Sequence, residues 1–155
     1  MKVVFLDIDG VISKLGPKGN LSLYGLSKPL LRNLSYLIKT SKSIIVLSST
    51  WRMYPEARRR LDRQLRFKGL KISSQTPVHN GGLMTDRPGE IEQWLKEHPN
   101  VTEYVIIDDV PDYFTGDLRA HCVACDPEQG LTEEKVQEAF EILGVEDELI
   151  SGEKT

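Results

Sequence analysis

The sequence predicts an α/β fold, a three-layer sandwich in which a five-stranded, mainly parallel sheet lies between two layers of helices. Two observations support this prediction. Short apolar runs rich in β-branched residues, typical of buried strands, alternate with longer segments whose apolar residues recur at helical spacing. Parallel strands need long crossovers, which are usually helices, so this alternation is typical of a parallel sheet covered on both faces.

Five segments of the chain fit buried strands. Residues 3–6 read Val-Val-Phe-Leu, and residues 43–47 read Ser-Ile-Ile-Val-Leu. A third strand is expected at residues 70–73, a fourth at 103–107, and a fifth with a weaker pattern at 120–124.

Four helices are expected between and after these strands. A proline opens each of the first three, where its missing N–H costs nothing, and Thr132 caps the fourth. The expected helices span residues 29–40, 55–68, 88–98 and 133–143. Residues 12–27, rich in glycine, are expected to form a turn-rich flap over the end of the first strand. The order of these elements predicts a Rossmann-like fold.

Length and composition favour one globular domain over residues 1–155. The chain is 39% hydrophobic and 28% charged, and its net charge of −3 does not mark the whole molecule as a nucleic-acid binder. No stretch approaches the ~20 apolar residues that a membrane span needs. Asp7 interrupts the first apolar run too early for a secretory signal. We therefore expect a cytoplasmic protein with no membrane partner; the sequence gives no oligomeric state.

The two cysteines, Cys122 and Cys125, form one Cys-x-x-Cys pattern. A second pair that would complete a zinc site is missing from the sequence. Side chains three positions apart on a strand also face opposite sides of a sheet. We expect two reduced structural thiols, and a metal or redox role is the less favoured alternative.

Two carboxylates follow the first strand directly. Asp7 and Asp9 come after its apolar run, and Gly10 supplies a flexible turn. A carboxylate that ends a buried strand is costly unless a cation or hydrogen-bond donors meet it, and ligands of parallel sheets bind at this edge. The arrangement suits one carboxylate as nucleophile and its neighbour as proton donor. The plainer alternative is that the two aspartates only begin a polar loop.

Polar residues also follow the second and fourth strands, at Ser48 and Asp108. The carboxyl ends of parallel strands share one edge, so these groups can converge on Asp7. Clustered carboxylates suit a hard divalent cation such as Mg²⁺. We expect Mg²⁺ to bind Asp7, Asp108 and the backbone carbonyl of Asp9. Asp109 is a further candidate ligand and Asp112 a weaker one.

Residues 5–11, Phe-Leu-Asp-Ile-Asp-Gly-Val, together with the groups at the other strand ends, resemble the motifs of the haloacid dehalogenase-like phosphohydrolases. The resemblance covers nearly the whole chain. It implies that Asp7 attacks phosphorus to form an aspartyl-phosphate, and that Asp9 is first the general acid and then the base for water. It also implies phosphate binding by Ser48 and its neighbour Ser49, and matches Asp108 and Asp109 to the acidic fourth motif.

The third motif of this chain differs from the usual pattern of that superfamily. A lysine is usual there, and this sequence has Arg87. Arginine stays charged and can make two parallel bonds to phosphate oxygens, so we expect Arg87 to bind phosphate as the lysine would. Val11 stands where threonine is common, and we expect little effect because that hydroxyl is not a reacting group.

A narrower resemblance concerns the segments at residues 47–52 (Leu-Ser-Ser-Thr-Trp-Arg), 87–95 and 130–132. They are similar to compact phosphatase domains of RNA-repair proteins, related to the phosphatase half of polynucleotide kinase-phosphatase. This implies removal of a terminal phosphate from nucleic acid, such as a polynucleotide 3′-phosphate. The chain contains no Gly-x-x-x-x-Gly-Lys-Ser/Thr pattern, so no fused kinase is expected in it.

The spacing of the motifs leaves no room for a cap domain, and an open site suits a large substrate. The helix at residues 56–68 carries six basic and two acidic residues, so its charge is +4 against −7 for the remainder. Such a face can steer a phosphate backbone, or it can simply be solvated. Trp51 and Arg52 are candidates for contact with the substrate, although Trp51 could equally belong to the core.

Three other functions stay open at this point. The chain could be a phosphatase of small molecules such as nucleotides or sugar phosphates, a phosphoprotein phosphatase, or an inactive domain that binds nucleic acid. The presence of both Asp7 and Asp9 argues against the last, because a pure binder has no use for a proton donor.

Overall fold

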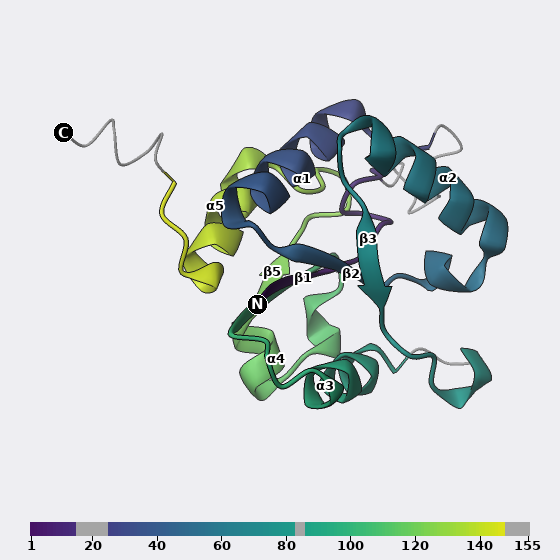
Figure 1. Ribbon diagram of the computed structural model, residues 1–155, viewed down its shortest axis with the longest axis vertical. Coiled ribbons are helices and arrows are strands. Elements are labelled where there is room, and N and C mark those ends of the chain that lie inside the picture. The colour runs from purple at the N-terminus through teal and green to yellow at the C-terminus, as the bar shows by residue number, and fades with distance from the viewer. Residues whose placement is uncertain (15–24, 83–85, 148–155) are drawn as a thin grey trace.

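A computed structural model of the chain describes residues 1–14, 25–82 and 86–147. In this part of the chain, five parallel strands form one sheet in the order β3-β2-β1-β4-β5 (Figure 1). They are β1 (Lys2–Leu6), β2 (Ile44–Leu47), β3 (Ile72–Gln75), β4 (Glu103–Asp108) and β5 (Cys122–Ala124). The first strand of the chain is therefore the central one, and the predicted parallel α/β sheet is confirmed.

Helices cover both faces of this sheet (Figure 1). One layer contains α1 (Lys28–Ser41), α2 (Pro55–Phe67) and α5 (Glu133–Leu143), and the other contains α3 (Arg87–Glu97) and the short α4 (Gly116–Ala120). Three 3₁₀ turns complete the elements: η1 (Thr50–Met53), η2 (Asn80–Gly82) and η3 (Pro111–Tyr113). This is the three-layer, Rossmann-like sandwich that the sequence predicts.

The central strand β1 supplies both halves of the core. Val4 and Leu6 pack with the α1, α2 and α5 layer, whereas Val3 and Phe5 pack with α3 and α4. All four side chains are completely buried, and burial of such a side chain stabilises the fold by about 1.5–3 kcal/mol. Because both faces of the strand are covered, its sequence is a continuous apolar run and not an alternating one.

The third strand begins two residues later than predicted, because Leu70 takes part in the turn that closes the end of α2. Gly69 takes a positive φ of +70°, and the Leu70 N–H donates to the Leu65 carbonyl at 2.9 Å. This closure is typical of helices that end in glycine, and here it turns Leu70 into the core. The strand can start only after that turn, at Ile72.

The fifth strand is shorter than predicted, because Ala120 ends α4. The sequence reading missed this helix. Its five residues make fewer than two turns, which is too short for a hydrophobic period to be visible.

The two cysteines lie on opposite faces of the sheet, as predicted. Cys122 packs with the α3 and α4 layer and Cys125 with the opposite layer, and both are free thiols. Burial raises the pKa of Cys122 to about 11 and that of Cys125 to about 12. Such thiols stay protonated and unreactive at neutral pH.

The middle of the predicted flap, residues 15–24, lies outside the described residues. Its two ends are joined by the Ser27 N–H, which donates to the Ile12 carbonyl at 2.9 Å. The described residues between β2 and β4 contribute to the sandwich and contain no separate cap domain. Among the described helices, none has the length and apolarity that crossing a bilayer requires. One domain over residues 1–155 and a cytoplasmic location stay predictions.

Candidate active site

Three strand ends meet at the carboxyl edge of the sheet. Leu6 is in register with the last residue of β2 and with Ile107 of β4, so Asp7, Ser48 and Asp108 follow at one level. The Asp7 N–H donates to the Ile107 carbonyl at 3.1 Å, and the Ser48 N–H donates to the Leu6 carbonyl at 3.0 Å. Side chains alternate along strands, which places these three on the face that α3 covers.

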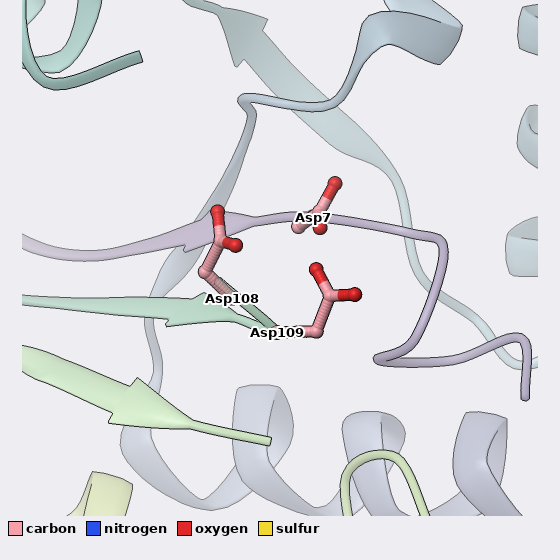
Figure 2. Close-up of side chains that lie close together, drawn as sticks. All are labelled: Asp7, Asp108 and Asp109. Carbon is pink, nitrogen blue, oxygen red and sulfur yellow. The ribbon is translucent and has the colours of Figure 1, made fainter. Parts of the chain in front are cut away.

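A cluster of three carboxylates forms at this level. Each of Asp7, Asp108 and Asp109 offers an oxygen, and these oxygens lie within 4.8 Å of one another. Figure 2 shows Asp7 at the end of β1 facing the other two at the end of β4. Asp7 and Asp108 are buried and Asp109 is half-buried. The predicted convergence of distant strand ends is thus present in the structure.

Arg87, the first residue of α3, is the cation that faces this cluster. Its Nη1 lies 2.7 Å from Oδ2 of Asp108 and 3.4 Å from Oδ2 of Asp7. Its guanidinium carbon also lies 5.6 Å from the centre of the Tyr113 ring. Among the described residues, one positive charge therefore pairs with this group of three carboxylates, and their full ionisation would leave a local excess of two negative charges.

The acidities of the cluster reflect this imbalance. Burial raises the pKa of Asp7 well above its ordinary value; the Arg87 charge opposes this, and Asp108 and Asp109 add to it. Burial also raises the pKa of Asp108, against the opposing effect of Arg87. Burial alone would lower the pKa of Arg87, but the two buried carboxylates raise it above its ordinary value. Positive charge is therefore what this site lacks.

Two buried polar atoms without hydrogen-bond partners also indicate a ligand at this site. Among the described residues, the Ser48 hydroxyl and the Nε of Arg87 are buried without a hydrogen-bond partner. A buried donor without a partner costs about 1–3 kcal/mol, so these atoms are ready to bind an anionic group. A phosphoryl oxygen is such a group, and a hard divalent cation fits the all-oxygen carboxylate cluster beside them.

Asp9 has a different environment from Asp7. It is half-buried, and its Oδ2 accepts a hydrogen bond from the indole Nε1 of Trp51 at 3.0 Å. Burial raises the pKa of Asp9, the Trp51 N–H lowers it, and the Asp109 charge raises it. A carboxyl group with a raised pKa can hold a proton and donate it, as a general acid requires.

Gly10 makes room for Asp109. Its φ is +78°, and a Cβ added there would lie 2.5 Å from Oδ2 of Asp109 and 2.8 Å from its Cβ. The turn after β1 also needs this conformation, since the Ile8 carbonyl accepts bonds from the N–H groups of Val11, Ile12 and Ser13. Any side chain at position 10 would displace the third carboxylate.

The two serines after β2 have separate roles. The Ser48 hydroxyl is buried without a partner, as described above. The Ser49 hydroxyl accepts the Trp51 N–H at 3.2 Å and so caps η1. Ser49 therefore holds the turn that brings the Trp51 ring to Asp9, and a role in phosphate binding stays a prediction.

Arg52 differs most from the sequence expectation, because all five of its N–H groups have partners within the protein. They donate to the carbonyls of Ser48, Ser49, Thr76 and Pro77 and form an ion pair with Glu90, with Nη2 and Oε2 at 3.0 Å. The side chains of Arg52 and Glu90 are each only 2% exposed. No donor is left for a substrate, and we assign Arg52 to holding the loops together.

Glu90 was missed by sequence reasoning, although a signal was present. The buried residues of α3 are Arg87, Glu90, Ile91 and Trp94, so charged residues occupy the helical stripe that should be apolar. The carboxylate of Glu90 also accepts the N–H of His79 at 2.9 Å. A charge on the buried stripe of an amphipathic helix indicates a buried partner.

The side chains of the remaining candidate ligands do not belong to the cluster of three. The carboxylate of Asp9 is not one of its three members, and Asp112 is exposed in η3. The expected contribution of the Asp9 backbone carbonyl stays a prediction. Trp51 is half-buried, packs against the core and also touches Asp9, so both interpretations of this residue hold in part.

This fold and this set of strand-end residues define a haloacid dehalogenase-like domain of the phosphohydrolase type. The model of one family, described as the HAD domain in Swiss Army Knife RNA repair proteins, matches residues 3–136. The chain belongs to that family. No curated protein and no solved structure shows significant similarity to the chain.

Proposed function

We propose that this protein is a Mg²⁺-dependent phosphohydrolase that works through an aspartyl-phosphate on Asp7. The observation that carries the proposal is the buried cluster of Asp7, Asp108 and Asp109, which Arg87 alone among the described cations pairs with, next to a second aspartate that has a raised pKa. The cluster suits a metal-assisted nucleophile, and Asp9 suits a proton donor.

Asp7, Asp108 and Asp109 would hold the ion, with the backbone carbonyl of Asp9 as a further ligand. Their donors are all oxygens, and the local excess of negative charge calls for a cation of charge two. When bound, Mg²⁺ supplies positive charge that lowers the pKa of the carboxylates and stabilises charge on the transferring phosphoryl group.

The chemistry then follows from the two aspartates. An oxygen of Asp7 bonds to phosphorus while the bond from phosphorus to the leaving oxygen breaks, and the carboxyl of Asp9 protonates that oxygen. The ionised Asp9 next takes a proton from water, whose oxygen attacks phosphorus. The bond between Asp7 and phosphorus breaks, which releases phosphate and restores both aspartates.

Ser48 and Arg87 serve the phosphoryl group in this scheme. The free hydroxyl of Ser48 donates to a phosphoryl oxygen, and the unpartnered Nε of Arg87 can do the same. Arg87 keeps its charge throughout because the neighbouring carboxylates raise its pKa.

We propose a terminal phosphate of a polynucleotide, such as a 3′-phosphate, as the substrate. The family to which the chain belongs is described from RNA repair proteins, and the described residues contain no cap that would enclose a small substrate. A long substrate can cover an open site with its own bulk.

A phosphate-release screen tests the proposal. The panel contains a 3′-phosphorylated oligoribonucleotide, its 5′-phosphorylated isomer, a free nucleotide and a phosphoserine peptide, each with Mg²⁺ and with EDTA. We expect release from the 3′-phosphorylated strand that EDTA abolishes. Asp7→Asn should be inactive, whereas Asp112→Asn, the same change outside the cluster, should be active. Phosphate release that survives EDTA or Asp7→Asn would contradict the proposed mechanism. Faster turnover of the nucleotide or the peptide would contradict the proposed polynucleotide substrate.

A further inference from the structure

The outward face of α2 concentrates positive charge. Arg59, Arg63 and Arg66 are exposed and follow one another at i, i+4 and i+7, which places them on one face of the helix. The opposite face is anchored in the core by Leu61 and Leu65. The three arginines are thus held by a rigid element and point away from the sheet.

These charges are not used within the protein. The ion pair on α2 joins Arg58 to Asp62, and in the described ranges no carboxylate lies within ion-pair distance of Arg59, Arg63 or Arg66. Residues 55–71 contain seven basic and two acidic residues, a formal charge of +5, which leaves −8 for the rest of the chain. Such a local reversal of sign favours a polyanionic partner at this face.

Exposed aromatic rings stand at both ends of the same helix. Phe67, its last residue, is 83% exposed, and Tyr54, which precedes its first residue, is 61% exposed. A phenylalanine with so little cover contributes nothing to the core. Arginines combined with exposed rings are the usual means of binding single-stranded nucleic acid, because every base can stack on a ring.

The helix also leads directly away from the candidate active site. Trp51, in the turn before α2, touches Asp9, and α2 begins at Pro55. Its 13 residues extend for about 20 Å along the outer layer of the sandwich (Figure 1). A groove of about 280 Å³ between this helix and the start of β3 is lined by three basic side chains and one acidic one: Arg58, Arg66, Lys71 and Asp62.

We propose that the outward face of α2, defined by Arg59, Arg63, Arg66 and Phe67, binds a single strand of nucleic acid whose terminal phosphate lies in the candidate active site. This inference rests on the proposed function for the position of the terminus. The arginines contact phosphates and Phe67 stacks on a base, so the strand is bound without preference for its sequence.

Binding of the product strand tests this separately from catalysis. The probe is a fluorescent single-stranded oligoribonucleotide of about 12 nucleotides that ends in a 3′-hydroxyl, followed by anisotropy at several salt concentrations. We expect Arg59→Ala with Arg63→Ala to weaken binding by on the order of tenfold at low salt. The plot of log K against log salt should become less steep by about 1.4, which is ~0.7 for each lost phosphate contact.

Matched variants show whether the face itself is responsible. Arg32→Ala with Lys96→Ala removes the same charge from exposed positions of α1 and α3 and should bind like the wild type. Phe67→Ala should weaken binding about fivefold or more without changing the salt slope. All of these variants should hydrolyse para-nitrophenyl phosphate at the wild-type rate.

The outcomes separate the two proposals. If Arg59→Ala with Arg63→Ala binds the strand as well as the wild type, or if both charge-removal pairs weaken binding equally, α2 is not the binding face. Loss of binding to anionic lipid vesicles or polyglutamate, with strand binding unchanged, would assign the face to another class of partner. A wild type that binds the strand but releases no phosphate would contradict the proposed function and leave the binding face supported.

Discussion

Two aspartates two positions apart have different surroundings, and the proposed mechanism assigns them different roles on this basis. Asp7 is buried against Arg87 and belongs to the carboxylate cluster, whereas Asp9 is half-buried and bonds to the Trp51 indole. Burial raises the pKa of both side chains. In the proposed mechanism, a divalent cation bound to the cluster would favour the ionised form of Asp7, and Asp9 would keep its proton for the leaving group.

Trp51→Phe should shift the pH profile of the enzyme. The indole N–H stabilises ionised Asp9 and so lowers its pKa; without it the pKa rises further. The alkaline limb of kcat, where Asp9 loses its proton, should therefore move to higher pH for a substrate with a poor leaving group. Trp94→Phe, which removes an indole bond to Ser74 and none to Asp9, should leave the limb in place. An unmoved limb, or a shift to lower pH, in Trp51→Phe would exclude Asp9 as the acid.

Gly10→Ala should separate fold from activity. The new Cβ would collide with the side chain of Asp109, and a positive φ costs an alanine about 1–2 kcal/mol. Gly116→Ala is the matched control, since its φ of +56° has a similar backbone cost but nothing lies within 4 Å of the added Cβ. In urea titrations we expect Gly10→Ala to lose at least as much stability as Gly116→Ala, and we expect loss of turnover only in Gly10→Ala. Equal turnover in both variants would show that Asp109 is dispensable.

Among the elements, β2, the loop after β3 and α3 are joined at the carboxyl edge of the sheet by the hydrogen bonds and the ion pair of Arg52. Arg52 joins the carbonyls that follow β2 to those of Thr76 and Pro77, and its ion pair with Glu90 reaches the first turn of α3. Arg87, the cation of the site, is three residues before Glu90 in that same turn. The contacts of Arg52 therefore position Ser48 and Arg87 relative to one another.

Loss of the Arg52–Glu90 ion pair should lower the free energy of unfolding substantially. Glu90→Gln leaves the Arg52 charge buried without its counter-charge, and loss of one partner of a buried pair costs about 3–5 kcal/mol. Arg58→Ala breaks the partly exposed pair with Asp62 and should cost no more than about 1 kcal/mol. Equilibrium unfolding in urea measures both. If the two variants lose the same stability, the buried pair does not hold these elements together.

The sequence was sufficient for the elements that carry strong patterns. Continuous apolar runs predicted the central strands, and the polar residues just after them predicted the meeting of Asp7, Ser48 and Asp108, because parallel strands in register must end together. The end of α2 and the short helix α4 were not predictable in this way. The end of α2 depends on the turn at Gly69, which includes Leu70 and so delays the start of the strand. The helix α4 is too short to show a hydrophobic period.

Partners of single side chains were the least predictable part of the site. The position of Arg52 after the hydroxyl cluster suggested contact with the substrate, but its five donors are satisfied by loops that are distant in the sequence. Nothing local in the chain specifies those contacts. By contrast, the charge on α2 could be counted directly, and the structure adds that Arg59, Arg63 and Arg66 are exposed on one face without an ion pair to any described carboxylate.

For the molecule as a whole, the buried carboxylates make stability depend on pH and metal together. The folded protein holds protons on Asp7 and Asp108 at pH values where the unfolded chain, with its ordinary pKa of 3.8, has released them. The folded state then binds more protons than the unfolded state. Without a divalent cation, the free energy of unfolding should therefore fall as pH rises above about 3.8.

Mg²⁺ should reverse this loss. An ion that binds only the folded cluster adds about 2.7 kcal/mol at a concentration one hundred times its Kd, and it binds better when the carboxylates are ionised. Thermal unfolding at pH 5 and pH 8, with EDTA and with Mg²⁺, measures the effect. We expect a larger rise in Tm with Mg²⁺ at pH 8 and a much smaller rise in Asp108→Asn. A rise that is independent of pH and of Asp108 would place the ion elsewhere.

The proposed function depends above all on Asp7 as the nucleophile of a metal-assisted phosphoryl transfer. Asp9→Asn tests it most directly with para-nitrophenyl phosphate, whose leaving group needs no protonation while hydrolysis of the intermediate still needs the base. After an acid quench, mass spectrometry of the peptides should find one phosphoryl group on Asp7, present only with Mg²⁺ and removed by hydroxylamine. A phosphoryl group on another residue, or turnover of this substrate with no phosphorylated peptide, would contradict the assignment of Asp7 as the nucleophile.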